Sequence, residues 1–364
     1  MTAPGCGRTL VVPGPGALQI VETPEPALAD GTFRGETLFT GLSAGTELTW
    51  YRGTNPYLAA GWDAELGLFE HGRPAQRYPV TRLGYMEVAR VTDSRTTAVA
   101  EGAVVAMAYG HSTVVHADPR THHVVQLPEG FDPLLGVYVA QLGPICANGL
   151  LHAAAEAGWS ELGDGVRDRR VLVTGGGAIG LLVALLARVH GAADVVLADA
   201  TPRRREAALS LGVHAVDETP GLARELKSRW HNGPGDHGAD VAFQCRGQAS
   251  ALATALRCLR PQGTVVDLAF YTGGAADLAL GEEFHHNGLT VRCAQIGRVP
   301  RSLAATWDRR RLSAETLALL AGHGELVRGH VLTDIVPFED APRLFADLSA
   351  RRRHVISAAF TLFV

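Results

Sequence analysis

The chain lacks several features that mark other kinds of protein. Lys227 is its single lysine, so a mechanism that needs a Schiff-base lysine is not expected. The formal net charge of −4 provides no basic field for nucleic acid or an anionic membrane. No apolar run approaches the ~20 residues of a membrane span, and the N-terminus shows no charged region followed by an apolar stretch. We therefore expect a cytoplasmic protein that binds neither nucleic acid nor membrane.

Cysteines are few and scattered, and none stands in a C-x-x-C pair. They are Cys6, Cys146, Cys245, Cys258 and Cys293. An odd number at such spacing argues against a disulfide framework and against a four-cysteine zinc lobe. The length of 364 residues exceeds that of one ordinary domain, so we expect two domains, each with its own core.

The hydrophobic pattern divides the chain into a β-rich front and an alternating centre. Short strands separated by turn residues are expected at 9–12, 18–21, 35–41, 102–107 and 112–116. Strands are then expected at 170–174, 195–199, 239–244, 264–270 and 289–296, and helices at 178–190, 202–211 and 249–259. Helical spacing also marks 134–158, 314–320 and 341–348, and the tail 354–364 has a strand pattern. Strands that alternate with helices of this length predict βαβ units and a parallel sheet.

The most informative segment is the glycine-rich turn between the strand at 170–174 and the helix that follows it. Its G-x-G-x-x-G spacing is that of a dinucleotide fingerprint, which permits a tight turn, a close approach of backbone to a pyrophosphate, and close helix packing. The helix N-terminus adds unpaired N–H groups and a partial positive charge. The residues expected to hold the pyrophosphate are Gly175, Gly177, Ala178, Ile179 and Gly180.

An acidic residue, Asp199, closes the next strand, 19 residues after Gly180. Its carboxylate can accept hydrogen bonds from both hydroxyls of an adenosine ribose, and it would repel a 2′-phosphate. Arg203 and Arg204 follow, and arginine there can bind that phosphate. The pattern favours NAD and leaves NADP open.

A series of short motifs runs along nearly the whole chain. They are Pro24-Glu-Pro26, Gly41-Leu-Ser-Ala-Gly-Thr-Glu47, Gly102–Met107, Leu127-Pro-Glu-Gly130, Gly238-Ala-Asp-Val241, Leu259-Arg-Pro-Gln-Gly-Thr-Val265 and Pro337-Phe-Glu-Asp-Ala341. Together with the glycine turn, their order resembles the medium-chain dehydrogenase/reductase superfamily, which includes the zinc alcohol and polyol dehydrogenases. The resemblance implies an α/β protein with a GroES-like catalytic domain at 1–147 and 297–364. It also implies a Rossmann domain, a doubly wound parallel sheet, at 148–296.

The sequence departs from this family at the positions of the zinc ligands. Where zinc members have the cysteine of a C-G-T-D-like motif, this chain has Ala44, and where they have the histidine of a G-H-E motif, it has Tyr85. The third ligand position falls close to Pro144. These residues cannot make a zinc site, which needs three protein ligands and an open position, and Cys146 alone cannot restore one. We therefore expect no metal.

Histidines could supply a different metal site. The candidates are His111, His116, His122 and His123. Adjacent residues of a strand point to opposite faces, so we interpret the pair at 122 and 123 as solvated loop residues rather than as ligands.

Without a Lewis acid, another group must polarise a carbonyl or accept an alcohol proton. Thr46 stands where the family uses a hydroxyl to relay the substrate proton. Tyr85 could donate a hydrogen bond to a developing alkoxide, and Glu47 could orient either residue or act as the base. A half-buried aromatic without a chemical role at Tyr85, and a structural role for Glu47, remain alternatives.

The resemblance implies further cofactor contacts and an oligomer. Residues that would lie near the cofactor are Arg204, Cys245, Ala269 and Ile296. The strand at 289–296 matches the sheet edge through which family members pair, so a homodimer is expected. The flanking segments look most like those of polyol, threonine and bacteriochlorophyllide dehydrogenases, which implies a small-molecule substrate.

Three functions are compatible with these features. The favoured one is zinc-independent transfer of a hydride between NAD(H) and a secondary alcohol or ketone of a sugar, cyclitol or biosynthetic intermediate. The second is an NADPH-dependent, zinc-free reductase of an activated C=C or C=N bond. The third is a non-catalytic dinucleotide-binding partner or redox sensor. Asp199 and the polyol-like flanks favour the first over the second, and Thr46 argues against the third.

Overall fold

The computed structural model describes residues 5–155, 158 and 160–362. The chain divides into two compact units, Met1–Gln141 with Thr333–Val364, and Leu142–Leu332. The sequence predicts that the segment 297–332 belongs to the first domain, but in the structure this segment packs with the second unit. The expected helical run at 134–158 and the tail strand at 354–364 reach positions 156–157 and 363–364, which lie outside the described residues.

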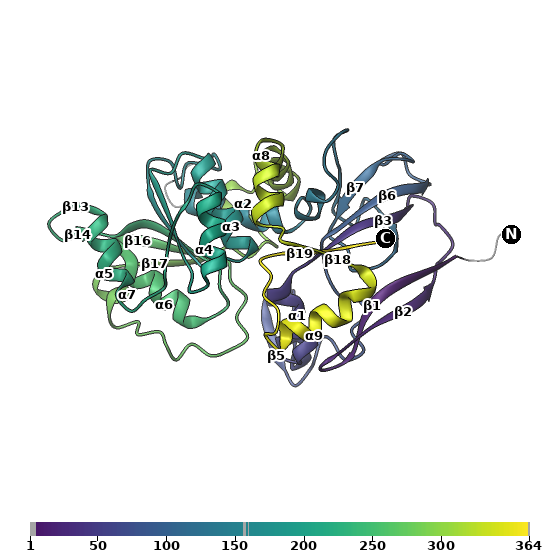
Figure 1. Ribbon diagram of the computed structural model, residues 1–364, viewed down its shortest axis with the longest axis horizontal. Coiled ribbons are helices and arrows are strands. Elements are labelled where there is room, and N and C mark those ends of the chain that lie inside the picture. Colours follow the sequence, from purple (N-terminus) through teal and green to yellow (C-terminus); the bar gives the residue numbers. More distant parts are fainter. Residues whose placement is uncertain (1–4, 156–157, 159, 363–364) are drawn as a thin grey trace. The chain divides into compact units, whose positions relative to one another are not determined.

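The second unit is built on a parallel sheet with the strand order β12-β11-β10-β15-β16-β17. Two of these strands, β16 and β17, are labelled in Figure 1. Its strands are β10 (Arg170–Thr174), β11 (Asp194–Ala198), β12 (His214–Val216), β15 (Ala239–Gln244), β16 (Leu259–Asp267) and β17 (Thr290–Cys293). All neighbouring pairs of this sheet are parallel, which confirms the parallel sheet predicted from the alternation of strands and helices. The strand order reverses between β10 and β15, so the chain returns to the middle of the sheet after β12.

Helices cover both faces of this sheet. They are α2 (Leu142–Ala154), α3 (Ala178–Val189), α4 (Pro202–Ser210), α5 (Leu222–Arg229), α6 (Ala249–Cys258), the short α7 (Glu283–His286) and α8 (Arg309–His330). Residues of α5 and α6 form one core with the sheet, whereas α3 packs with α2 and α4, and α8 packs on α2 and α4. The small hairpin of β13 (His231–Gly233) and β14 (Asp236–His237) follows α5.

The segment after β17 is held to the second unit by buried polar contacts. The Trp307 side chain is buried, and its indole N–H donates to the Ser160 carbonyl oxygen at 2.7 Å. The Asn148 amide, on α2, donates to the carbonyl oxygens of Ala294 and Arg298 at 3.4 and 3.2 Å. These contacts and the packing of α8 on α2 explain why 297–332 lies with the Rossmann-type sheet.

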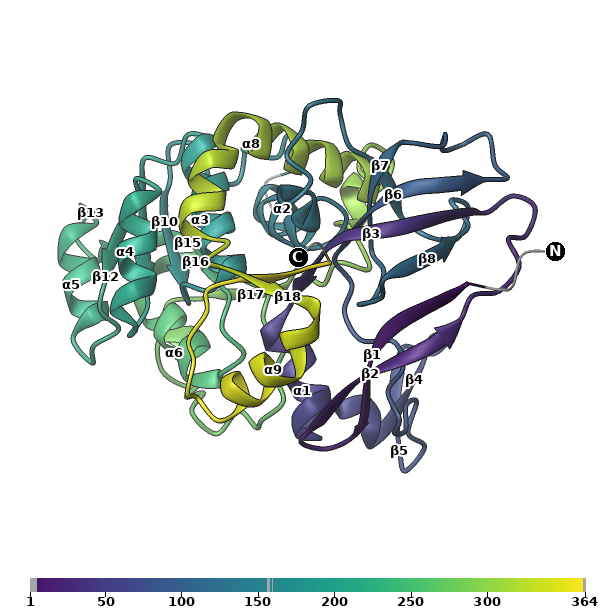
Figure 2. The ribbon, with the colours of Figure 1, turned by 45° about the vertical axis from the view of Figure 1, so that its right-hand side comes forward.

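The first unit is a mostly antiparallel sheet with the order β18-β19-β3-β6-β7-β9, and β8 pairs with β3 (Figure 2). These strands are β3 (Phe33–Leu42), β6 (Glu87–Ser94), β7 (Val104–Met107), β8 (Val114–Ala117), β9 (Val124–Gln126), β18 (Asp334–Pro337) and β19 (Ala358–Thr361). The unit also contains two separate antiparallel hairpins. One is formed by β1 (Cys6–Gly14) and β2 (Ala17–Pro24), and the other by β4 (Ala60–Asp63) and β5 (Leu68–His71). The helices are α1 (Ala44–Arg52) and α9 (Ala341–Ser349), with 3₁₀ turns at Pro56–Leu58, Leu135–Tyr138 and Phe338–Asp340.

Two apolar cores hold the first unit. One lies between strands around Phe33, Val91 and Val115, and the other joins β1, α1, α9 and β19. The sequence pattern did not predict α1, β6 or the β4–β5 hairpin, because these segments carry little clear periodicity. The hairpin leaves several large apolar side chains partly exposed, among them Trp62, Leu66, Leu68 and Phe69.

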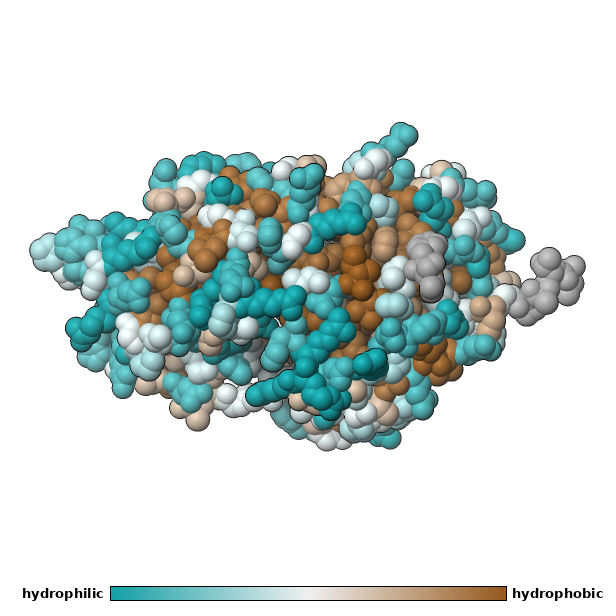
Figure 3. All heavy atoms as spheres, viewed as in Figure 1, coloured by the Kyte–Doolittle hydropathy of each residue, from teal (hydrophilic) through white to brown (hydrophobic). Residues whose placement is uncertain are grey.

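Within the part of the chain that the structure describes, no helix has the length and the apolar composition needed to cross a bilayer. Figure 3 shows patches of hydrophobic residues among hydrophilic ones on one face of the molecule.

Candidate active site

Three hydroxyl groups meet at the start of α1 in the first unit. Ser43 is the N-cap residue of this helix, and Thr46 lies in its first turn. The Tyr85 hydroxyl, from the turn that precedes β6, bonds to the Ser43 hydroxyl and donates to Thr46 Oγ1 at 3.4 Å. Tyr85 and Thr46 are partly exposed as residues, whereas Ser43 is buried.

Behind these hydroxyls lies a buried pair, Glu47 and His111. Glu47 Oε2 lies 2.6 Å from His111 Nε2, and Glu47 Oε1 accepts a hydrogen bond from the Ser43 N–H at 2.7 Å. Glu47 is 1% exposed and His111 is fully buried. With both oxygens occupied inside the protein, the carboxylate is placed to orient Ser43 and not to reach a substrate.

The hydrogen bonds place one proton on Nδ1 of His111 and a second one between His111 and Glu47. The Thr40 hydroxyl donates to the Met86 carbonyl oxygen at 3.0 Å, so its oxygen accepts from His111 Nδ1–H at 2.7 Å. A second proton lies in the contact between His111 Nε2 and Glu47 Oε2, since one of these two atoms must donate. The pair is therefore neutral overall, whichever of its two atoms carries that proton.

Burial also sets the protonation of Tyr85. Burial raises the pKa of the Tyr85 hydroxyl above its ordinary value of 10, and the nearby Glu47 charge acts in the same direction. Hydrogen bonds with Ser43 and Thr46 oppose this shift without cancelling it. Tyr85 is therefore a neutral phenol, and hence a hydrogen-bond donor, at neutral pH.

The residues at the family's zinc positions do not fit a zinc ion. Ala44 carries no donor atom, Tyr85 is engaged with Ser43, and Pro144 lies buried in α2 of the second unit. Among the residues that the structure describes, no group of three or more histidine, cysteine, aspartate or glutamate side chains is arranged to hold a metal.

In the second unit, the glycine turn connects β10 to α3 as expected. Gly175 has a φ of +98°, and Gly177 is the N-cap of α3 with open space where a Cβ would stand. A Cβ on Gly180 would lie 1.8 Å from the Gly175 carbonyl oxygen, so only glycine allows the helix to begin so close to the turn. Ala178 and Ile179 open α3, where free N–H groups can bind a phosphate.

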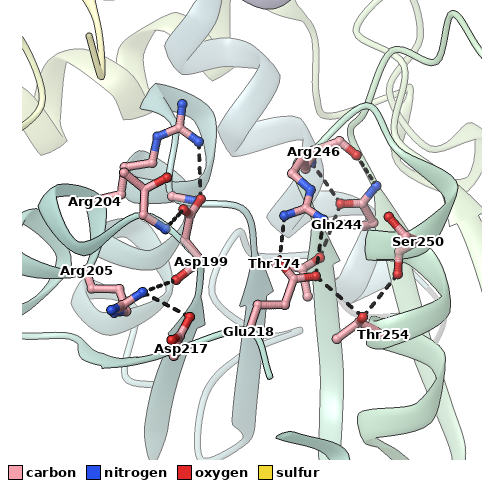
Figure 4. Close-up of polar contacts among 12 residues, drawn as sticks. Thr174, Asp199, Arg204, Arg205, Asp217, Glu218, Gln244, Arg246, Ser250 and Thr254 are labelled. Carbon is pink, nitrogen blue, oxygen red and sulfur yellow. Dashed lines mark hydrogen bonds and ion pairs between the residues drawn. The ribbon is translucent and has the colours of Figure 1, made fainter. Parts of the chain in front are cut away.

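Asp199 lies at the end of β11 and beside this turn (Figure 4). Its Oδ2 accepts from the Gly176 N–H at 2.7 Å and from Arg204 Nη1 at 3.3 Å, and its Oδ1 accepts from the Thr201 N–H at 2.8 Å. Burial raises the pKa of Asp199, but the two backbone N–H bonds and the Arg204 charge outweigh it and hold the pKa below 3.8. The carboxylate is thus an anion, held in place by backbone and covered by Arg204.

A cavity of about 310 Å³ lies at the carboxyl ends of β11, β12 and β15, where Ala200, Glu218 and Arg246 line it. Arg246 and Glu218 face each other across its wall, with Arg246 Nη1 2.5 Å from Glu218 Oε2 and Nη2 3.2 Å from Oε1 (Figure 4). The Gln244 side chain accepts from the Arg246 N–H at 2.8 Å, which holds that backbone at the strand end. Ligands of open α/β sheets bind at this edge, so the cavity is a candidate for the adenosine half of a dinucleotide.

The other cofactor candidates lie at the same sheet edge. Cys245 follows β15, and burial raises the pKa of its thiol well above 9.0, which disfavours the nucleophilic thiolate. The Ala269 N–H donates to the Asp267 carboxylate at 2.9 Å, just after β16. Ile296 follows β17 in the segment that Asn148 holds.

Sequence reasoning missed several members of these sites. His111 was considered only as a metal ligand, and Ser43 and Thr40 were not singled out. His111 is 64 residues from Glu47 and 71 from Thr40 along the chain, so no local spacing reveals the contact. Glu218 and Arg246 were likewise not expected to form an ion pair.

Comparisons with known proteins agree with this architecture. Residues 178–309 match the family model of the zinc-binding dehydrogenases. That match lies within the second unit and contains none of the positions 44, 85 and 144. The chain is 26% identical over 355 residues to D-guloside 3-dehydrogenases of Shigella flexneri and Escherichia coli K12, covering 93% of this chain and 95% of each relative. An L-idonate 5-dehydrogenase (NAD(P)⁺) of E. coli K12 is 33% identical over 126 residues, about a third of each chain.

Solved structures share the fold at low sequence identity. One is a protein from Sinorhizobium meliloti 1021, described as a zinc-binding dehydrogenase bound to NADP, with a TM-score of 0.73 and 18% identity over 98% of this chain and 99% of its own. Another is a short chain alcohol dehydrogenase from E. coli CFT073 complexed with NADH, with a TM-score of 0.73 and 16% identity over 98% and 100%. A GroES-like domain with a Rossmann domain is common to these structures, as predicted from the sequence.

The family model and the curated relatives named above are dehydrogenases, and the glycine turn between β10 and α3 has the backbone geometry expected of a dinucleotide site. The chain is similar to named dehydrogenases over nearly its whole length and is an NAD(P)-dependent oxidoreductase.

Proposed function

We propose that this enzyme transfers a hydride between NAD(H) and a secondary alcohol or ketone of a sugar-like substrate, without a catalytic zinc. The observation that carries the proposal is the Tyr85 hydroxyl, held by Ser43 and Thr46 at the position where the family resemblance places a zinc ligand. Thr46 remains at the position of the family's proton-relay hydroxyl. Nicotinamide, when bound, supplies the acceptor or donor of the hydride.

Tyr85 takes the role of the group that polarises the substrate oxygen. A neutral phenol donates a hydrogen bond to a carbonyl or alkoxide oxygen, and one such donor typically contributes 10²–10³ in rate, about 2.7–4 kcal/mol. The contact from Tyr85 to Thr46 is long at 3.4 Å, so the phenol proton can turn to a substrate oxygen at little cost. In ketone reduction the same proton passes to the product alcohol, and in alcohol oxidation it returns to the phenolate.

This assignment of the proton predicts the direction of the pH dependence. Because burial raises the pKa of Tyr85, the phenol is the resting form at neutral pH, and ketone reduction is supported there. Alcohol oxidation needs the phenolate, so its kcat rises with pH in the alkaline range. Glu47 supports the site through the Ser43 N–H.

NAD is the proposed cofactor, with NADP less favoured. Support comes from Asp199, which carries its negative charge at neutral pH and is anchored by the N–H groups of Gly176 and Thr201. A 2′-phosphate beside that carboxylate would be repelled, whereas ribose hydroxyls can donate to it once Arg204 moves aside. Fluorescence titration with NADH and NADPH tests this choice, and binding of NADPH without binding of NADH would overturn it.

The proposed substrate class follows the relatives. The D-guloside 3-dehydrogenases match nearly the whole chain, and the idonate dehydrogenase also acts on a polyhydroxylated compound. We therefore infer oxidation of a secondary hydroxyl on a glycoside or polyol. The first assay pairs methyl D-guloside with NAD⁺ or NADP⁺ and follows the absorbance of the reduced cofactor.

Two measurements test the mechanism. Metal analysis of active protein should find no stoichiometric zinc, and one zinc per chain required for turnover would refute zinc independence. Tyr85→Phe should lower kcat by about 10²-fold with little change in the Kd for NADH, because it removes one donor to the reacting oxygen and leaves the cofactor unit intact. Full turnover by Tyr85→Phe would remove the proposed role.

A homodimer through β17 is also proposed. Support comes from the position of β17 at the edge of its sheet, where Val291 is 40% exposed. An unpaired strand edge of this kind is a surface for pairing with a second chain. Light scattering should give the mass of a dimer, and Val291→Lys should shift it towards the monomer.

A further inference from the structure

We propose that His111 is a positioning residue of this enzyme, which acts through Glu47 to hold the Ser43–Tyr85 hydroxyl pair in its working geometry. The inference rests on the proposed role of Tyr85 and adds to it the buried residues that position this hydroxyl. His111 itself lies too deep to touch a substrate, because its side chain is fully buried.

A continuous set of contacts leads from His111 to Tyr85. His111 Nε2 is 2.6 Å from Glu47 Oε2, and the other carboxylate oxygen accepts from the Ser43 N–H at 2.7 Å. The Ser43 hydroxyl then bonds to the Tyr85 hydroxyl. The backbone N–H of Ser43 and the hydroxyl that holds Tyr85 thus belong to the same residue, so a displaced carboxylate displaces that hydroxyl.

The other side of His111 is equally constrained. Its Nδ1 donates to Thr40 Oγ1 at 2.7 Å, and the Thr40 hydroxyl donates to the Met86 carbonyl oxygen at 3.0 Å. The ring also packs edge-on against Phe360, with ring centroids 5.3 Å apart and planes at 83°. Both ring nitrogens are hydrogen-bonded and the ring packs against Phe360. These contacts fix the position of His111 relative to Glu47.

The His111 ring also lies close to Gly84, the residue that precedes Tyr85. Gly84 has a φ of +90°, and a Cβ there would lie 2.7 Å from His111 Nε2. The backbone at Gly84 therefore approaches the imidazole more closely than any residue with a side chain could. His111 is thus linked to Tyr85 by two routes, through the backbone at Gly84 and through Glu47 and Ser43.

Substitutions in the Glu47–His111 pair can separate hydrogen bonding from ionisation. Gln in place of Glu47 can accept from the Ser43 N–H with its oxygen and donate from its amide to a neutral His111 that carries its proton on Nδ1. Glu47→Gln therefore keeps both hydrogen bonds but has no ionisable group at position 47. Glu47→Ala keeps neither, and His111→Phe removes the partner of the carboxylate while it fills a similar volume.

The first measurement is steady-state kinetics with methyl D-guloside and NAD⁺. If the pair positions Tyr85, Glu47→Ala and His111→Phe should each lower kcat by at least about 10-fold, since small misplacements of a reacting group have effects of this size, with KM for NAD⁺ changed less than about twofold. Glu47→Gln should retain at least about tenfold more kcat than Glu47→Ala. If Glu47 were instead the general base, Glu47→Gln would lose as much activity as Glu47→Ala, and the proposal would be refuted.

The second measurement does not depend on turnover. Protein is labelled with carbon-13 at the tyrosine ring carbon that bears the hydroxyl, and the Tyr85 resonance is assigned by its absence in Tyr85→Phe. Glu47→Ala and His111→Phe should shift the Tyr85 resonance, whereas Glu47→Gln should leave it near its wild-type position. Tyr271, in the second unit, serves as the reference tyrosine.

A matched control exists in the same unit. His116 also pairs with a glutamate, Glu25, at 3.3 Å, but contacts none of the hydroxyl cluster. His116→Phe should therefore leave both the Tyr85 resonance and kcat unchanged.

The two proposals fail separately. An unshifted Tyr85 resonance in both Glu47→Ala and His111→Phe would overturn the positioning role, whatever the activity. If either variant does not fold, the other and Glu47→Gln still decide. Full activity of Tyr85→Phe, with the resonance shifts present, would refute the chemical role of Tyr85 and leave the positioning contacts standing.

Discussion

Replacement of Gly84 by alanine probes the support of Tyr85 by way of the backbone. Gly84 has a φ of +90°, and alanine in the left-handed region is strained by ~1–2 kcal/mol. The new Cβ would also lie 2.7, 2.8 and 3.0 Å from three atoms of the His111 ring. The ring cannot move aside without stretching its contacts with Glu47 and Thr40, 2.6 and 2.7 Å long.

The size of the effect follows from these two contributions. Weakening the hydrogen bonds of a buried pair that can carry charge costs ~1.5–3 kcal/mol. Together with the backbone strain, Gly84→Ala should lower the free energy of unfolding by ~3–5 kcal/mol. The variant should also have a lower kcat, because the displaced ring disturbs Glu47 and hence Ser43.

A control separates strain from the clash. Gly102 has a φ of +83° with nothing within 4 Å of its Cβ position, so Gly102→Ala should lose only the strain contribution, ~1–2 kcal/mol. Urea unfolding of both variants measures the difference, which should be ~2–3 kcal/mol. A difference below ~1 kcal/mol would show that His111 moves freely, and the constrained network described above would then be incorrect.

Two further predictions concern ionisable groups. Glu87 is fully buried with a hydrogen bond from Thr37, and burial raises its pKa well above 4.5, an effect the Thr37 bond only reduces. Because the folded pKa is the higher one, the contribution of Glu87 to stability is complete below pH 4.5 and is lost as pH rises towards the folded pKa, by ~1.4 kcal/mol per unit. Glu87→Gln should abolish this slope in urea unfolding, and an unchanged slope would contradict the buried neutral acid. Asp199→Asn should raise the affinity for NADPH relative to NADH by about tenfold, because it removes the charge that repels a 2′-phosphate. An unchanged ratio in fluorescence titrations would show that Arg204 already neutralises the carboxylate.

Much of the second unit could be predicted from the sequence because its signals are local. The strand at 170–174 is present as β10, and the helix expected at 178–190 is present as α3, at Ala178–Val189. These elements are apolar over most of their length, and a glycine turn lies between them. In the first unit, α1 and the β4–β5 hairpin escaped prediction because short amphipathic segments carry weak periodicity, and their packing partners lie far away in the chain.

The sequence alone determined the residue types on which the chemistry depends. A G-x-G-x-x-G turn between a strand and a helix specifies a dinucleotide site through local backbone geometry, and Ala44 supplies no ligand for a metal in any conformation. Tertiary structure decided how the remaining groups are used. It buried Glu47 against His111, placed Arg204 over Asp199, and paired Arg246 with Glu218. Such contacts join residues far apart in the chain or depend on which side chains become desolvated together, and no local pattern encodes them.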